Sequence, residues 1–236
     1  GSNYLSAGRV RFGVDSISTG NLDSNLQFIV SNNGEYEAMR ITSDGLVGIG
    51  TANPARLLHL HESSSDGSFL SFTNTTTGAG GGDGAVIGIQ DDESVIISNK
   101  ENNHIELHTN NTERLRIKSD GKVGIGTDNP GARLHTYGGN VILENQGGIT
   151  VNLRRDDTST AANRLLGAIQ FQGNDSNGTY ETGAIIKASS EAAHGTGDKP
   201  SRLEFHTTPD NSATPVERLR IASDGSIYAG ASIITE

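Results

Sequence analysis

One long phrase occurs twice in this chain of 236 residues and limits what the chain can fold into. "DGLVGIGTANP" (44–54) returns almost unchanged as "DGKVGIGTDNP" (120–130), and "SDGSIYAGASI" (223–233) is a third, weaker copy. A recurrence of this length indicates an architecture built from repeated modules. The inserts between the copies differ in length, so the modules do not form a strict solenoid.

Each copy ends a longer stretch in which apolar and polar residues alternate. In the second stretch, Leu115 and Ile117 precede the tripeptide Ser-Asp-Gly, and Val123 and Ile125 follow it. A period of two indicates strands with one buried face, and Asp-Gly between such runs is a strong hairpin signal. We therefore expect a small antiparallel meander in each of the three stretches, 25–54, 104–130 and 202–233.

The glycines of "VGIG" need an explanation inside a strand. The two apolar residues share one face, and Gly48 and Gly50 share the other. A strand face without side chains suits the close approach of another backbone, and a β-bulge or a strongly twisted edge strand is the alternative. The Asn-Pro at 53–54 stops the ladder, and "RLLHL" (56–60) resumes a strand. The third copy has Tyr228 in place of Gly48 and no proline, so it is expected to end the array.

The inserts 63–103 and 138–201 are rich in Gly, Ser, Thr, Asn and Asp, and they contain no predicted helix of ten or more residues. Six short apolar runs in them are strand candidates. The chain is therefore predicted to be all-β, with modules at 3–54, 55–130 and 131–236. The strand candidates are "SFLSF" (68–72), "GAVIGI" (84–89), "SVIIS" (94–98), "NVILEN" (140–145), "GAIQFQ" (167–172) and "GAIIKAS" (183–189).

Composition excludes several classes of partner and chemistry. The formal charge of −10 argues against nucleic acid and anionic lipid surfaces, and no segment is predicted to insert into a membrane. The absence of cysteine excludes disulfides and thiolate chemistry. With 33% hydrophobic residues, one Met and no Trp, the core of a lone chain would be thin. We expect neighbouring subunits to complete it.

The phrase "ERLRI.SDG.VGIGT.NP" (113–130) resembles the repeat of trimeric fibre proteins, above all bacteriophage tail fibres, and of related trimeric adhesins on bacteria. The insert 165–208 is similar to a module found beside that repeat. The resemblance covers most of 25–230. It implies an elongated homotrimeric fibre of intertwined β-prism or triple β-helix segments that alternate with small β modules, located in the virion tail fibre or on a bacterial surface. It also implies a self-cleaving C-terminal chaperone released near "AGASIITE" (229–236), for which a simple chain boundary is the alternative.

The function that follows is a structural and adhesive fibre segment, not an enzyme, whose receptor is a host-surface glycan or another surface molecule. A polysaccharide-degrading spike and a purely structural shaft are the alternatives. The loops 74–84, 172–182 and 189–201 combine glycine with polar side chains and are the expected contact regions. The residues predicted to contact the receptor are Asn74, Asp83, Asn174, Asp175, Asn177, Tyr180, His194 and Asp198.

The motif "HLH" suggests a metal site. His59 and His61 alternate along an expected strand, so both imidazoles point to the same side. In a parallel trimer six imidazoles would meet on the axis and bind a transition metal, as the resemblance to iron-binding fibre tips implies. Aligning "RLLHLH" with "RLHTY" (133–137) gives the alternative, in which Leu58 and Leu60 face the axis and the histidines lie outside. No other cofactor is predicted.

No motif marks a catalytic site. Acidic runs occur at 91–93 and 156–157, but exposed turns account for them, and there is neither a nucleophile elbow nor a phosphate-binding loop. The arginines of the repeated phrase alternate with buried residues and form either a stripe for an anionic ligand or ion pairs with nearby glutamates. We expect cross-strand ion pairs. These arginines are Arg40, Arg114, Arg116, Arg218 and Arg220, and the glutamates are Glu37, Glu113 and Glu217.

Overall fold

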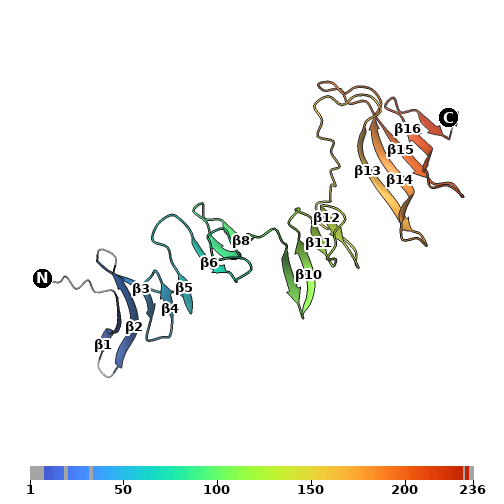
Figure 1. The fold of residues 1–236 in the computed structure, drawn as a ribbon. Helices are drawn as coiled ribbons and strands as arrows, with labels where there is room; N and C mark the ends of the chain where they lie inside the picture. The colour runs from blue at the N-terminus through green and yellow to red at the C-terminus, as the bar shows by residue number, and fades with distance from the viewer. Residues whose placement is uncertain (1–7, 19–20, 32–33, 231, 234–236) are drawn as a thin grey trace. The chain divides into compact units, whose positions relative to one another are not determined.

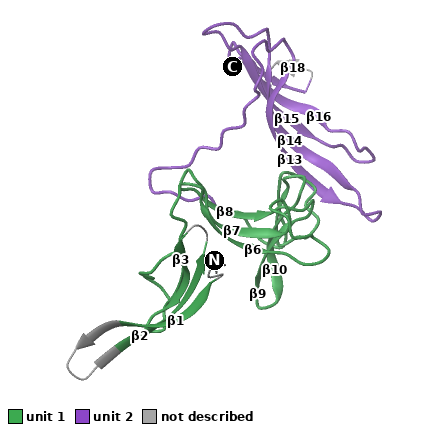
Figure 2. Cartoon of the chain, turned by 60° about the vertical axis from the view of Figure 1, so that its left-hand side comes forward, with its two compact units in different colours: residues 1–141 green, residues 142–236 purple. Residues whose placement is uncertain are grey.

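The computed structural model describes residues 8–18, 21–31, 34–230 and 232–233. Every regular element in these ranges is a β-strand, which confirms the all-β prediction (Figure 1). The ranges contain no helix with the length and apolarity needed to cross a membrane. The chain divides into two compact units, residues 1–141 and 142–236 (Figure 2).

The strands form four sheets, named A to D here, and each is built from strands that follow one another in the chain. Sheet A contains β1 (Arg9–Ser18), β2 (Asn21–Ser31), β3 (Glu35–Ile41), β4 (Val47–Ile49) and β5 (Leu58–Leu60). Sheet B contains β6 (Ser68–Phe72), β7 (Ala85–Ile89) and β8 (Val95–Asn99). Sheet C contains β9 (Ile105–Thr109), β10 (Thr112–Ile117), β11 (Val123–Ile125) and β12 (Leu134–Thr136). Sheet D contains β13 (Leu165–Asn174), β14 (Tyr180–Ser190), β15 (Ser201–Thr207), β16 (Val216–Ile221), β17 (Ile227–Ala229) and β18 (Ser232–Ile233).

Sheets A, C and D each contain the same arrangement of strands, as the repeated phrases predict. In sheet C the strand register aligns Ile105, Ile117, Val123 and Leu134 across four strands. Because side chains alternate between faces, this row and the row two residues away along each strand form an apolar face. The row between them forms a polar face. The same register places Leu26, Ile41, Val47 and Leu58 in one row of sheet A, and Leu203, Ile221 and Ile227 in one row of sheet D.

The Ser-Asp-Gly segments form the predicted hairpins. The Gly45 N–H donates to the Thr42 carbonyl and the Thr42 N–H to the Leu46 carbonyl, both at 2.9 Å. Gly45 has a φ of 78°, so this is a three-residue connection that ends with glycine in the left-handed region. The segments 118–122 and 222–226 repeat the same two hydrogen bonds.

Each module carries a β-bulge before this hairpin. Glu113 pairs with His108 and Leu115 with Leu107, so Arg114 between them is skipped in the register. The carbonyl of Arg114 instead accepts a hydrogen bond from the Gly126 N–H at 3.0 Å. Ala38 with Gly50 and Arg218 with Gly230 repeat this contact at 3.1 and 2.9 Å. The extra residue also turns positions 113 and 116 to the same face of the sheet.

The glycines of "VGIG" admit the backbone that follows them. β4 pairs in parallel with β5, and the short segment 50–57 connects them. A Cβ on Gly48 would overlap the Thr51 carbonyl oxygen, and one on Gly50 would overlap that of His61. Another backbone does approach here, as predicted, but it belongs to the same chain, whereas the resemblance to trimeric fibres implies the backbone of a neighbouring chain. In the second copy Gly124 and Gly126 meet the carbonyls of residues 127 and 137 in the same way.

The third copy differs where the sequence differs. β17 pairs with β18 in the antiparallel sense, with Tyr228 opposite Ile233, and β17 has no parallel neighbour in the described part of the chain. In the first two copies the parallel strands after Asn-Pro still belong to the same sheet. Sheets A and C therefore end at residues 60 and 136, beyond the predicted module boundaries at 54 and 130.

Five of the six strand candidates in the inserts are strands, and "NVILEN" is not. That prediction is wrong for this single chain, in which residues 140–144 take part in no backbone hydrogen bond of the described part. A strand needs a neighbouring backbone to pair with, and no strand of the described residues pairs with this segment. Sheet B, by contrast, joins the three strand candidates of the first insert into an antiparallel meander.

Gly50→Ala is expected to destabilise the chain far more than Gly45→Ala. Both glycines have positive φ, of 76° and 78°, so each alanine carries the same conformational penalty of about 1–2 kcal/mol. Only at Gly50 does the methyl group also meet a backbone oxygen, whereas Gly45 has open space. We expect a loss of about 3 kcal/mol or more for Gly50→Ala in urea unfolding of the full chain. Equal losses would contradict the close approach.

Candidate functional site

Charged side chains gather on the polar face of sheet C. Glu106 of β9 lies between His108 of the same strand and His104 just before it, with its carboxylate oxygens 2.8 Å from the Nε2 atoms of both histidines. Residues two apart in a strand share a face, which explains this triplet. Arg116 on the neighbouring strand donates from Nη2 to Glu106 at 2.6 Å. The interactions with His108 and Arg116 favour the ionised carboxylate and lower the pKa of Glu106.

The bulge adds a second glutamate to this cluster. Arg116 Nη2 also lies 2.5 Å from Glu113, three residues earlier in the same strand. Glu37 with Arg40 (2.7 Å) and Glu217 with Arg220 (2.9 Å) repeat the pair in the other modules. The sequence predicts ion pairs between neighbouring strands, but they form mainly within one strand. The reason is that the bulge turns the glutamate and the arginine three residues later to the same face. Arg114 and Arg218 donate instead to the hydroxyls of Thr109 and Thr207, at 2.9 and 3.0 Å.

Sheet D holds the corresponding cluster in a buried form. Glu204 occupies the register position of Glu106 and is only 1% exposed. Lys187 of β14 and His206 lie 2.9 and 3.0 Å from its Oε2, and Arg202 donates to its other oxygen. Burial raises the pKa of Glu204, but the hydrogen bonds from Lys187, His206 and Arg202 outweigh burial and lower this pKa to about 2. The His206 side chain is only 12% exposed at this contact.

Two groups of side chains have the chemistry of metal ligands. They are Glu106, His108 and Glu113 in sheet C, and Glu204, His206 and Glu217 in sheet D. In each group the ligand atoms lie within 4.8 Å of one another. However, Arg116 already binds both carboxylates of the first group, and Lys187 and Arg202 bind Glu204. The protein's own cations therefore balance these charges, and the clusters tie neighbouring strands together.

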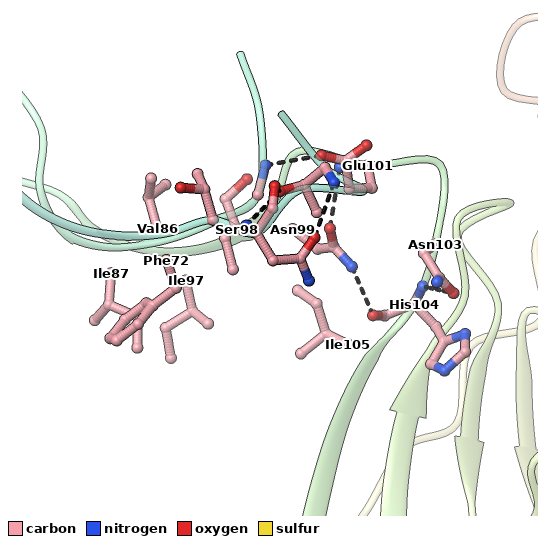
Figure 3. Close-up of a pocket in the computed structure, with 15 residues that line it drawn as sticks. Phe72, Val86, Ile87, Ile97, Ser98, Asn99, Glu101, Asn103, His104 and Ile105 are labelled. Atoms are coloured by element: carbon pink, nitrogen blue, oxygen red, sulfur yellow. Dashed lines mark hydrogen bonds between the residues drawn. The ribbon is translucent and has the colours of Figure 1, made fainter. Parts of the chain in front are cut away.

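A groove of about 450 Å³ lies beside sheet B (Figure 3). Phe72, Ile87 and Ile97 of sheet B line it together with Ile105, the first residue of β9. Figure 3 shows its polar rim, where the Asn99 side chain donates to the His104 carbonyl at 3.0 Å. The sequence alone did not indicate this groove, because its wall combines an insert with the following repeat. The alternation in "SFLSF" and "SVIIS" was the available signal.

The first predicted contact loop, 74–84, joins β6 to β7. The Asn74 carboxamide oxygen accepts the N–H groups of Thr76 and Thr77, both at 2.9 Å. Asp83 accepts the Gly80 N–H at 2.7 Å. Both predicted residues therefore shape their own loop, and Asn74 also lines the groove.

Four predicted contact residues come together at the tip of the β13–β14 hairpin. Asn174 pairs with Tyr180 across the two strands. Asp175 accepts the N–H groups of Asn177 and Thr179 at 3.0 and 3.2 Å and so closes the turn. The Tyr180 side chain is 64% exposed. The tip thus presents a phenol ring, amides and hydroxyls on a defined turn.

His194 and Asp198 lie at the other end of β14. β14 comprises 11 residues, so roughly 35 Å of strand separates them from the hairpin tip. The His194 N–H donates to the Thr160 carbonyl at 2.9 Å, and Asp198 forms a bridge with Gly195. The predicted loop 189–201 also begins inside β14, where Ser190 is fully buried. These two residues and the hairpin tip therefore do not form one site.

The histidines of "HLH" lie opposite the leucine face, as the alternative alignment requires. His59 pairs with Gly48 in the register, and Leu58 and Leu60 belong to the apolar rows. Nδ1 of His59 accepts the Ala55 N–H at 3.3 Å, and the ring centroids of His59 and His61 are 6.1 Å apart. His135 holds the corresponding loop in the second module through the Gly131 N–H, also at 3.3 Å. Metal binding by His59 and His61 between subunits stays a prediction.

Carboxylates of the two acidic runs accept hydrogen bonds from backbone N–H groups within turns. Asp92 accepts the Ser94 N–H at 2.9 Å in the β7–β8 connection, where Glu93 has a φ of 67°. Asp157 pairs with Arg155 at 2.9 Å and accepts the Ser159 N–H at 3.0 Å. Both arrangements fit the interpretation of these carboxylates as turn residues. That the chain is not an enzyme stays a prediction.

Comparison with known proteins found no matching family and no matching curated protein. Two solved structures are similar over 99% of this chain. They are the carboxy-terminal domain of the bacteriophage T5 L-shaped tail fibre with its intramolecular chaperone domain (11% identity, TM-score 0.36) and that domain alone (12% identity, TM-score 0.28). The alignments cover 52% and 75% of those chains, so this chain spans about half the length of the first. Both TM-scores are too low to establish a shared fold, and the function is therefore inferred from this chain's own residues.

Lowering the pH is expected to remove the stabilisation contributed by Glu204. Because its pKa in the folded chain (about 2) lies below the ordinary value of 4.5, the ionised carboxylate stabilises the fold fully above about pH 4.5, and the contribution is lost as the pH falls toward 2. This loss is on the order of 3 kcal/mol. Urea unfolding at several pH values measures it, and Glu204→Gln should abolish this part of the pH dependence.

The matched control is Glu106→Gln at the same register position of sheet C. The Glu106 side chain is partly exposed, so solvent screens its interactions and its substitution should change the pH dependence much less. An equal effect of the two substitutions would contradict the role of burial.

Proposed function

We propose that this chain is a segment of a homotrimeric bacteriophage tail fibre that contributes to attachment at a host-cell surface. Its location would be the virion tail fibre, outside the cell, and a bacterial surface adhesin is the alternative location. The observation that carries the proposal is the uncovered apolar face of the repeated module. The resemblance of the phrase 113–130 to trimeric fibre repeats supports the number three.

The apolar face of sheet C lacks a second layer. Leu107 is 54% and Leu134 is 63% exposed, although both belong to the aligned apolar rows. A sheet in a stable domain normally buries such a face against a helix or another sheet. Among the described residues, Ile29 is the only large hydrophobic side chain that is buried, and it is still 8% exposed. The cover for these faces is therefore expected from other copies of the chain.

The other two modules lead to the same conclusion. Leu58 in the apolar row of sheet A is 52% exposed, and Leu203 and Ile221 in that of sheet D are 37% and 38% exposed. Burial of apolar surface contributes about 25 cal/mol per Å², so covering these faces would strongly favour association. When parallel copies associate in register around one axis, equivalent apolar rows of each module meet at the same level.

Sheet B continues the apolar surface toward sheet C. The register aligns Leu70, Ile87 and Ile97 on one of its faces, and all three are exposed. The groove brings this face next to Ile105, which begins an apolar row of sheet C. A second copy that covers sheet C would therefore extend over this groove, and the first insert would take part in assembly.

The hairpin tip around Tyr180 is the best-defined candidate for receptor contact. It presents an exposed aromatic ring beside the polar side chains of Asn174, Asp175 and Asn177, a combination that suits the apolar faces and hydroxyl groups of a surface glycan. In a trimer three tips would act together, so avidity would compensate for weak individual sites.

Light scattering after size exclusion tests the assembly. We expect a mass near 74 kDa, three times 24.7 kDa, for the unmodified chain. The double variant Leu107→Glu and Ile117→Glu places charges on the apolar face and should shift the mass to that of one chain. His108→Gln on the opposite face of β9 is the control, because it alters the same strand without adding a carboxylate beside Glu106, and it should leave the mass unchanged. An unmodified chain that remains at 24.7 kDa at all concentrations would refute the trimer.

Competition with intact fibres for host cells tests the receptor contact. Tyr180→Ala should weaken binding of the assembled protein at least tenfold, because each of three sites loses a stacking contact worth about 1 kcal/mol. Tyr137→Ala is the control, since Tyr137 is equally exposed but lies outside the hairpin. If the unmodified trimer neither binds nor competes, the segment is a structural shaft and receptor contacts lie elsewhere.

A further inference from the structure

The segment "NVILENQGGITVN" (140–152) has the composition of strands but forms none in the single chain. Aliphatic and β-branched residues surround its central Gly-Gly, and such residues favour strands. The structure nevertheless assigns no strand between β12 and β13, and Figure 1 draws this part as an irregular trace. In the described chain, its only backbone–backbone hydrogen bond runs from the Gly148 N–H to the Asn145 carbonyl, at 3.2 Å.

The apolar side chains of this segment are exposed to solvent. Ile142 is 78% and Val151 is 64% exposed, and Val141, Leu143 and Ile149 are exposed as well. A segment that merely joins two units is normally polar or rich in glycine and proline, because solvent surrounds it. In a strand, the three consecutive aliphatic residues 141–143 would place apolar side chains on both faces, because successive side chains point to opposite sides. A flexible linker therefore does not account for the segment.

The segment is anchored at its C-terminal end. Leu153 packs on Gly167 of β13, where an added Cβ would lie 2.6 Å from the Cβ of Leu153. Arg155 pairs with Asp157 at 2.9 Å and reaches the Leu165 carbonyl at 3.5 Å. These contacts attach the chain to sheet D after residue 152. Residues 141–144 and 149–152 precede this anchor and have no hydrogen-bonded neighbour in the described chain.

The turn between the two halves is already formed. Asn145 accepts the Gly147 N–H on its side chain at 3.1 Å and the Gly148 N–H on its carbonyl, and Gly148 has a φ of 92°. A defined turn between two apolar arms is the usual connection of two strands. The two arms, residues 141–144 and 149–152, have no paired strand in the described chain.

We propose that residues 141–144 and 149–152 become strands when the chain assembles, by hydrogen bonding to the same residues of neighbouring copies. This inference rests on the self-association proposed above. A second copy is the occupant that fits, because equivalent segments of parallel copies meet at one level around a common axis. It supplies the missing donors and acceptors, and it covers both faces of the aliphatic run at the same time.

Hydrogen exchange of the unmodified, assembled chain tests the proposal directly. The amides of 141–144 and 149–152 should exchange at least tenfold more slowly than in an unstructured peptide of the same sequence. In the single chain these amides have no backbone partner, so any protection reports a contact that assembly creates.

Proline substitution tests the same hydrogen bonds by removing donors. Ile142→Pro combined with Val151→Pro breaks no backbone hydrogen bond of the described single chain, but it removes donors from the assembled one. We expect the concentration needed for assembly to rise at least tenfold. Ile142→Thr combined with Val151→Thr retains both N–H groups and the β-branched shape, and this control should assemble much closer to the unmodified concentration.

The outcomes separate this inference from the proposed trimer. A trimeric mass with unprotected amides in the segment would overturn the inference and leave the trimer in place. Assembly of the proline variant at the unmodified concentration would do the same. A mass of 24.7 kDa for the unmodified chain at every concentration would overturn both.

Discussion

A single-layered sheet that has one apolar face needs a second layer, and this need governs the rest of the structure. In each repeated module the register gathers leucine, isoleucine and valine on one face and charged residues on the other. No other element of the described chain fully covers the apolar face, as the exposure of Leu107 and Leu134 shows. Because burial of such surface is the main favourable term in folding and association, the completed core is expected from other copies.

Within each module, the bulge and the glycine that follows the hairpin are joined by a hydrogen bond and act together. The bulged residue turns its carbonyl to the glycine N–H, as Arg114 does to Gly126. In the first two modules the same glycine has positive φ and leaves room for the carbonyl of the parallel strand. The bulge also brings the glutamate and arginine three residues apart onto one face. One inserted residue thus determines the ion pair as well as the path of the chain.

The charged clusters illustrate how an added strand changes the electrostatics of the same register position. In sheet C the position is held by Glu106 on an edge strand, and its carboxylate remains partly exposed. In sheet D the strand β14 lies beside β15 and contributes Lys187, which helps bury Glu204 and keeps it charged. The sheet A module has Gln27 and Ile29 at the equivalent positions of Glu106 and His108, so it lacks the cluster. The added strand, rather than the repeated motif alone, therefore gives Glu204 both its burial and its hydrogen bond from Lys187.

The sequence by itself determined the local structure. Period-two alternation and Ser-Asp-Gly located the meanders and hairpins, and the absence of side chains at Gly48 and Gly50 indicated a close backbone approach. These signals are local, because they depend on side-chain direction and on backbone conformations that only glycine adopts easily. The tertiary structure decided which backbone comes close, how the bulge redirects Glu113 and Arg116, and which predicted contact residues meet at the hairpin tip. It also showed that "NVILEN" has no partner strand within the described chain, since a strand exists only where another backbone supplies its hydrogen bonds.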